Sequence, residues 1–310
     1  MVTFGQKTTF TLAPNAAAIS DPIDFKVPPL SNLAVSIYVS QGSQPTTLHS
    51  LGVQTAYEAA RDQTSATSFA ANATTTQSRY LLSGIDVVSE GNTGTIVTFG
   101  DSITDGFAST PDANKRWPDD LSARLQAKGA LDHLAIANEG ISGNRLLAEG
   151  IGPNAQSRFD RDVVSRPGLR YVTVLEGIND IGFAAFGGPA PSASDIIAAY
   201  KNLISRAHEK GARIFGCTLT PFKGAGYYTV AGEQTRETVN AWIRTSGQFD
   251  GVIDFEAAVR DNSNPPQLNP AFDSGDHLHP NNAGYAAMAK SIDLRLFSLP
   301  PFVASARETY

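Results

Sequence analysis

Residues 95–106 spell TIVTFGDSITDG and decide the fold, because a strand-like run meets a glycine-flanked turn there. Thr95–Phe99 is short, β-branched and aromatic, as expected for a strand buried inside a parallel sheet. Gly100 and Gly106 bracket the turn that follows and place Ser102 directly after the strand. Catalytic groups of open α/β sheets gather at such strand ends. The stretch therefore predicts an exposed serine hydroxyl, although a serine that only caps a turn or a helix has the same pattern.

Strands and helices alternate along the rest of the chain. We expect strands at 95–99, 134–138, 171–175, 213–218 and 252–255, and helices near 118–128, 192–210, 233–246 and 282–297. That alternation predicts a parallel sheet covered by helices on both faces. Within 192–210, apolar residues recur at helical spacing and predict a face turned to the core.

The first part of the chain has a different period. Leu33, Val35, Ile37 and Val39 alternate with other residues, which predicts a half-buried strand. Prolines and Ser/Thr/Asn-rich links recur throughout this part, as in an antiparallel sandwich. A polar, glycine-bearing break at 89–94 then precedes the parallel-sheet pattern. We expect a small β-sandwich or jelly-roll-like domain at 1–93 and an α/β catalytic domain at 94–310.

Composition and charge limit the partners. The 310 residues are 41% hydrophobic and 17% charged, enough to bury a sizeable core. Lys and Arg number 24 against 30 Asp and Glu, and this net charge of -6 disfavours nucleic acid. No apolar run approaches the roughly 18 residues of a membrane span, and Met1–Lys7 lacks the pattern of an export signal. We expect a soluble chain, either cytoplasmic or exported with a leader already removed.

Candidate groups for activating Ser102 lie near the other end of the chain, in the segment DHLHP at 276–280. A serine hydroxyl needs a base, and the base needs an orienting group. Asp276 precedes His279 by three residues in a tight loop, so its carboxylate can reach the ring Nδ1 and leave Nε2 facing outward. The alternatives are that Asp276 caps the next helix, or that His277 and His279 bind a metal, which the lack of a partner segment disfavours.

Two loops after neighbouring strands provide candidate oxyanion donors. Gly143 offers a backbone N–H without a Cβ in the way, and Asn179 offers a side-chain NH₂. Together with the N–H of Ser102 they would make a three-donor hole. Each loop is also explained as an ordinary turn, since turns favour Gly and Asn. Ser142 is a rival serine whose neighbours suit anion binding better than activation of a nucleophile.

In chain order, four blocks resemble the signature blocks of the GDSL, or SGNH, hydrolases: Gly-Asp-Ser at 100–102, Gly143, Gly-x-Asn-Asp at 177–180 and Asp-x-x-His-Pro at 276–280. The resemblance runs from about Thr95 to Leu299, with Ile103 where the family's name motif has leucine. It implies a flavodoxin-like three-layer α/β/α domain that needs no metal or organic cofactor. The residue roles that it implies are Ser102 as nucleophile, Gly143 and Asn179 as oxyanion donors, and Asp276 with His279 completing the triad.

The segments at 112–119 and 275–280 also resemble bacterial arylesterases and acylhydrolases of the xylanase-cluster esterase type. Members of that subgroup often carry a longer β-rich N-terminal part, which implies that residues 1–90 are a shortened version of it. The expected activity is hydrolysis of short-chain acyl or aryl esters, with a small-molecule ester as partner. Two alternatives stay open: a carbohydrate O-acetylesterase acting on an acetylated carbohydrate, and a glycan-binding protein whose hydrolase half is inert.

Overall fold

The computed structural model describes residues 1–14, 16–40, 47–68, 73–89 and 91–303. The chain divides into two compact units, Met1–Val35 and Ser36–Tyr310. In the first unit, the Asp21 carboxylate accepts hydrogen bonds from the Thr3 hydroxyl and from the backbone N–H groups of Gly5 and Gln6. These bonds close the chain into a loop without a regular ladder among the described residues of this unit.

The prediction of a strand at 33–39 is wrong, because these residues form no ladder. The side chains of Leu33, Val35, Ile37 and Val39 are all exposed. Alternating apolar residues make a strand only when a neighbouring strand pairs with them and their apolar face is buried. Further along, β1 (Leu48–His49) pairs with β4 (Arg79–Tyr80), and β2 (Ala56–Glu58) pairs with β3 (Thr74–Thr76), both antiparallel. These short ladders do not confirm a sandwich, and a domain boundary between residues 93 and 94 stays a prediction.

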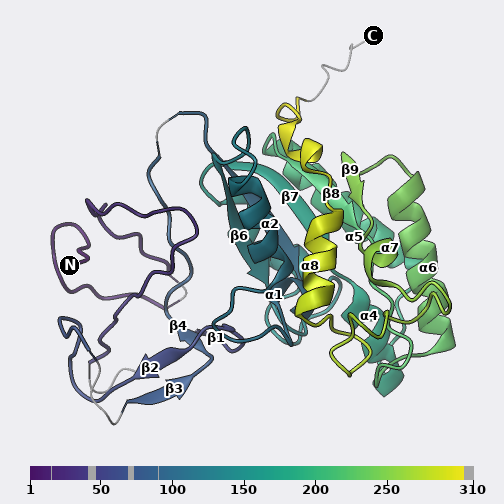
Figure 1. Ribbon diagram of the computed structural model, residues 1–310, viewed down its shortest axis with the longest axis horizontal. Coiled ribbons are helices and arrows are strands. Elements are labelled where there is room, and N and C mark those ends of the chain that lie inside the picture. Colours follow the sequence, from purple (N-terminus) through teal and green to yellow (C-terminus); the bar gives the residue numbers. More distant parts are fainter. Residues whose placement is uncertain (15, 41–46, 69–72, 90, 304–310) are drawn as a thin grey trace. The chain divides into compact units, whose positions relative to one another are not determined.

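The α/β part of the second unit is built on a five-stranded parallel sheet with the order β6-β5-β7-β8-β9 (Figure 1). Every strand expected downstream of residue 94 is present. The strands are β5 (Gly94–Gly100), β6 (Leu134–Gly140), β7 (Leu169–Leu175), β8 (Arg213–Cys217) and β9 (Gly251–Ile253). The first strand, β5, lies between β6 and β7, so the loops after all three meet at one edge.

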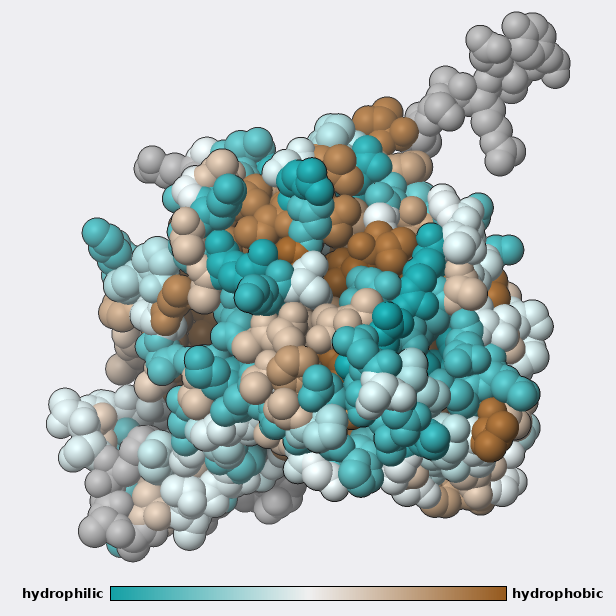
Figure 2. Space-filling model, turned by 45° about the vertical axis from the view of Figure 1, so that its right-hand side comes forward, coloured by the Kyte–Doolittle hydropathy of each residue, from teal (hydrophilic) through white to brown (hydrophobic). Residues whose placement is uncertain are grey.

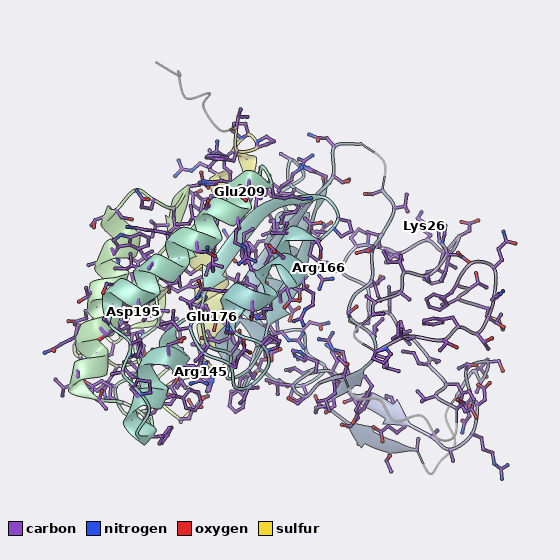
Figure 3. All side chains as sticks on the ribbon, turned by 180° about the vertical axis from the view of Figure 1, so that it is seen from behind. Lys26, Arg145, Arg166, Glu176, Asp195 and Glu209 are labelled. Carbon is purple, nitrogen blue, oxygen red and sulfur yellow. The ribbon has the colours of Figure 1, made fainter. Side chains whose placement is uncertain are left out.

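Helices cover both faces of this sheet. The helices are α1 (Ser102–Asp105), α2 (Trp117–Gln126), α3 (Ala155–Phe159), α4 (Ile178–Phe183), α5 (Ala193–Glu209), α6 (Val230–Thr245), α7 (Phe255–Val259) and α8 (Asn282–Ser291). Short π and 3₁₀ turns lie at Asp160–Val164, Ala184–Phe186 and Leu294–Ser298. Helices α2 and α8 lie over one face (Figure 1), and α5, marked by Asp195 and Glu209, crosses the other (Figure 3).

The expected core face of α5 is confirmed: Ile196, Tyr200, Leu203 and Ala207 are buried. Ser192 begins the helix with a capping box, in which its hydroxyl oxygen accepts from the Asp195 N–H while the Asp195 carboxylate accepts from the Ser192 N–H. Cys217 is buried at the end of β8.

The outer surface mixes polar and apolar side chains. In Figure 2, brown hydrophobic areas on the visible face are interrupted by teal and white residues. Over the described ranges, no helix has the length and apolar composition needed to span a membrane.

Candidate active site

Ser102 lies at the junction between the end of β5 and the start of α1, where the backbone segments pack closely. The Asp101 side chain caps α1 by accepting a hydrogen bond from the Ile103 N–H, so Ser102 is the first residue of the helix. A Cβ at Gly100 would come within 2.4 Å of the Leu175 carbonyl oxygen, and one at Gly140 within 2.2 Å of the backbone nitrogen of Asp105. Only glycine fits at these two strand ends, because α1 packs directly against them.

Arg158 links the ends of β5 and β6 beside Ser102. Its guanidinium donates to the backbone carbonyls of Gly100 and Glu139, at 2.9 and 2.8 Å, and lies 4.0 Å from the Phe99 ring centroid. The buried Glu176 carboxylate lies 3.7 Å from the same guanidinium. Burial raises the pKa of Asp101 to about 7 and that of Glu176 well above its ordinary value. The backbone beside Ser102 is therefore held by buried hydrogen bonds, in surroundings that exclude water.

His279 contacts the Ser102 hydroxyl directly, with 2.8 Å between Nε2 and Oγ. On its other side, Nδ1 lies 2.6 Å from Oδ2 of Asp276. A carboxylate oxygen only accepts, so Nδ1 carries the proton, and Nε2 of the neutral ring is free to accept from the serine. Ser102, His279 and Asp276 thus form one continuous hydrogen-bonded chain, with the ring between hydroxyl and carboxylate.

The Asp276 carboxylate is itself held in place by the loop. Its Oδ1 accepts from the backbone N–H groups of Leu278 and His279, at 3.0 and 2.8 Å. Burial favours the neutral acid, but the hydrogen bonds from His279 outweigh it and hold the pKa of Asp276 well below its ordinary value. The aspartate therefore stays ionised at neutral pH and keeps the proton of the ring on Nδ1.

Asp276 does not cap the following helix. Asn281 does, because its side-chain oxygen accepts from the N–H groups of Ala283 and Gly284. His277 points to a different partner from that of His279: its Nδ1 lies 2.6 Å from Oδ2 of Asp273, and half of its side chain is exposed. Across the described ranges, no three His, Cys, Asp or Glu side chains gather as a possible metal-binding group.

Asn179 lies at the start of α4, one turn beyond the end of β7, and its side chain is buried. Its amide is fixed at both ends. Nδ2 donates to the Asn144 carbonyl at 2.9 Å, and Oδ1 accepts from the Tyr227 hydroxyl at 3.3 Å. Because an amide nitrogen has two hydrogens, one donor of Asn179 remains for another acceptor.

Gly143 lies in the loop after β6, next to Asn144, and has a φ of 79°. This left-handed backbone conformation explains why glycine occupies the position. The preceding residue, Ser142, is tied to α1: its hydroxyl and its backbone N–H donate to Oδ2 of Asp105, at 2.7 and 3.1 Å. Ser142 is therefore engaged by a carboxylate, which leaves Ser102 as the serine that contacts a histidine.

From the sequence we expect an acyl pocket formed by aromatic residues in loops beyond the strand ends: Trp117, Phe107, Phe183, Phe186, Tyr227 and Tyr228. Trp117 does not belong with them, because it is fully buried against Phe255 in the core. Phe107 lies beside the site, with its ring centroid 4.2 Å from that of His279. Phe183 and Tyr227 lie 6.0 Å apart by ring centroids, and Tyr227 reaches Asn179.

The sequence did not predict the hydrogen bond between Tyr227 and Asn179, nor the contacts of Asp105. The aromatic pair at 227 and 228 was visible, but nothing local distinguishes the tyrosine that reaches the amide from the one that packs on Phe222. Asp105 was visible as the acid three residues after Ser102. Its partners are 37 and 56 positions away in the chain, beyond any local pattern.

A parallel α/β sheet with a serine just beyond β5, the second strand in the sheet order, hydrogen-bonded to a histidine and through it to an aspartate, is typical of serine hydrolases. Residues 98–287 match the GDSL-like lipase/acylhydrolase family, so the chain belongs to that family. No curated protein matches its sequence.

Several solved structures share the fold. The chain is similar to an aryl esterase of M. smegmatis, at 17% identity and a TM-score of 0.53, with 66% of this chain and 99% of that one covered. It is also similar to Est24, a carbohydrate acetylesterase from Sinorhizobium meliloti, at 14% identity and a TM-score of 0.51, with 66% and 99% covered. An acetyl xylan esterase, AlAXEase, matches at 19% identity and a TM-score of 0.50, with 64% and 96% covered.

Proposed function

We propose that the protein hydrolyses short-chain acyl or aryl esters in two steps, through an acyl-enzyme on Ser102. The hydrogen-bonded chain from Ser102 through His279 to Asp276 is the observation that carries this proposal. In the first step, Ser102 Oγ attacks the ester carbonyl while His279 Nε2 takes the hydroxyl proton. The ring then gives this proton to the leaving alcohol as the ester C–O bond breaks.

In the second step, a water molecule loses a proton to Nε2 and attacks the acyl carbonyl, which releases the acid and restores the serine hydroxyl. The ring returns this proton to Oγ as the bond between Oγ and the acyl carbon breaks. Both steps place negative charge on the carbonyl oxygen. We assign three donors to it: the N–H of Ser102, the N–H of Gly143 and the remaining Nδ2 hydrogen of Asn179. The support is that β5, β6 and β7 end at one sheet edge and that Asn179 is bonded to Asn144, next to Gly143.

Aromatic side chains lie near the serine and its proposed oxyanion donors. Phe107 lies against the His279 ring, and Phe183 and Tyr227 form an aromatic wall next to Asn179. Such rings offer apolar contact area for an acyl or aryl group close to the attacked carbonyl. The alternative substrate, an O-acetylated carbohydrate, presents the same acetyl group on a larger alcohol.

A p-nitrophenyl ester chain-length series tests the proposal, with Ser102→Ala as the control. We expect hydrolysis that is fastest for acetyl to butyryl esters and close to background in the variant. Acetate release from acetylated xylan in parallel decides between the two alcohols. Retained turnover by purified, folded Ser102→Ala protein would exclude this nucleophile. Failure of a serine-reactive phosphonate to label the wild-type protein would support an inert hydrolase half.

A further inference from the structure

The Asp105 carboxylate lies between two parts of the chain that are distant in sequence. Its Oδ2 accepts from the hydroxyl and the backbone N–H of Ser142, as described above. Its Oδ1 lies 2.7 Å from Nε2 of His49. Only 6% of the Asp105 side chain is exposed, so both oxygens depend on these protein partners for their hydrogen bonds. Because the carboxylate only accepts, Nε2 of His49 carries the proton at this contact.

His49 ends β1 and is brought to Asp105 by a segment anchored at several points. The Asp112 backbone N–H donates to the Val53 carbonyl at 3.1 Å, and the Asp112 carboxylate accepts from the Thr55 N–H at 2.6 Å. Arg116 donates to the Gly52 carbonyl through Nη2 and to the Asp105 carbonyl through Nε. Val53 is buried. The position of His49 is therefore set by a network and not by one contact.

Two consequences follow from the position of Asp105. Asp105 is the last residue of the short helix α1, which begins at Ser102. Its carboxylate accepts hydrogen bonds from Ser142, the residue before Gly143. The carboxylate therefore links the segment of the nucleophile to the loop of a proposed oxyanion donor. Loss of His49 would leave Oδ1 buried with one partner fewer, and the carboxylate could then rotate away from Ser142. An oxyanion donor stabilises the transition state only when it is correctly placed, so a small shift of this loop lowers the rate.

We propose that His49 is a positioning residue of the active site, acting through Asp105 and Ser142 on the N–H of Gly143. This inference rests on the proposed oxyanion hole and gives a role to the segment around β1, which lies outside the family match at 98–287. The segment 48–58 is then a functional part of the catalytic unit, because its His49 donates to Oδ1 of Asp105 from outside the matched region.

The test compares His49→Ala, His49→Gln and a matched control, His133→Ala, in the full chain. His133 directly precedes β6, at the opposite end of that strand from Ser142. With p-nitrophenyl acetate we expect His49→Ala to lower kcat roughly tenfold to a hundredfold, with KM changed less than about twofold. His49→Gln should restore most of kcat, because its amide can donate to Oδ1. His133→Ala should retain the wild-type kcat and KM.

A double variant separates positioning from general stability. In the Ser142→Ala background, His49→Ala should lower kcat by a smaller factor than it does alone, because both act through the same carboxylate. If His49→Ala does not fold, His49→Gln and Ser142→Ala still decide, since Ser142→Ala should lower kcat and His49→Gln should stay close to wild type. Wild-type kcat in folded His49→Ala or in Ser142→Ala, or a loss of Tm without a loss of kcat, overturns the inference. An active Ser102→Ala protein would instead overturn the proposed function.

Discussion

Ser102 Oγ lies 2.8 Å from Nε2 of His279, although 177 positions separate the two residues in the chain. Three features of the fold produce this contact. Ser102 lies two residues beyond the end of β5, His279 lies in the loop before α8, and the hydroxyl of Tyr285 in α8 donates to the Phe107 carbonyl at 2.6 Å. The last bond ties α8 to the segment just after Ser102 and keeps the ring over the hydroxyl.

Replacement of Asn179 by alanine tests the proposed oxyanion donor. We expect kcat to fall by two to three orders of magnitude, a barrier increase of about 3 kcal/mol, because one donor to the developing charge is lost. The KM for p-nitrophenyl acetate should change little, since the donor acts mainly in the transition state. Steady-state kinetics with a circular dichroism check of folding measures this, and an unchanged kcat would remove Asn179 from the hole.

The Tyr227 hydroxyl sets the orientation of that amide, and Tyr227→Phe removes one oxygen atom without emptying the aromatic wall. We expect kcat to fall about tenfold at most, less than in Asn179→Ala, because one fixing hydrogen bond is lost and the donor itself remains. Tyr228→Phe is the matched control, since that ring packs on Phe222. In the Asn179→Ala background, Tyr227→Phe should have no further effect. An equal loss in both backgrounds would show that the hydroxyl acts elsewhere.

Asp276→Asn tests whether the carboxylate orients the ring. We expect a loss in kcat on the order of a thousandfold or more, because an amide no longer holds the ring proton on Nδ1. Since the pKa of Asp276 is held below its ordinary value, wild-type protein should not lose activity through this group until the pH falls below about 4. Asp293→Asn, at an exposed ion pair with Arg295, is the control. A variant with near wild-type kcat would argue against a triad.

The stability of the fold in acid should depend on Glu256. Burial favours its neutral form, but Arg236 and Arg244 outweigh this and hold the pKa of Glu256 below its ordinary value. A lowered folded-state pKa contributes stability above the unfolded-state pKa of about 4.3, and this contribution is lost as the pH falls below it.

Glu256→Gln should therefore lower the free energy of unfolding by about 3 kcal/mol at pH 7, where it leaves Arg236 buried with one partner fewer. The difference from wild type should shrink between about pH 5 and pH 3. Urea unfolding across this range measures both values. Glu237→Gln, exposed on α6, should match wild type throughout. A difference that does not change with pH would mean that the charge of Glu256 is not what stabilises the fold.

The α/β half of the chain was predictable because its signals are local. The apolar patterns of buried strands and amphipathic helices can be recognised within a window of a few residues. For example, a helix was expected at 192–210, and α5 is found at Ala193–Glu209. The prediction of a strand at 33–39 was wrong because alternation is a local pattern, whereas a strand forms only when a neighbouring strand pairs with it and its apolar face is buried. Trp117 was misplaced because an aromatic next to a loop has the same local pattern whether it packs inward or outward.

The sequence by itself determined which residue types follow each strand, and the three-residue spacing of Asp276 and His279 was enough to predict their contact, because a tight loop limits how far apart they can lie. Only the tertiary structure decided that this pair meets Ser102, that Tyr227 reaches Asn179 and that His49 reaches Asp105. The physical reason is that hydrogen bonds act over about 3 Å, whereas strand order and helix packing set which distant segments come within that range.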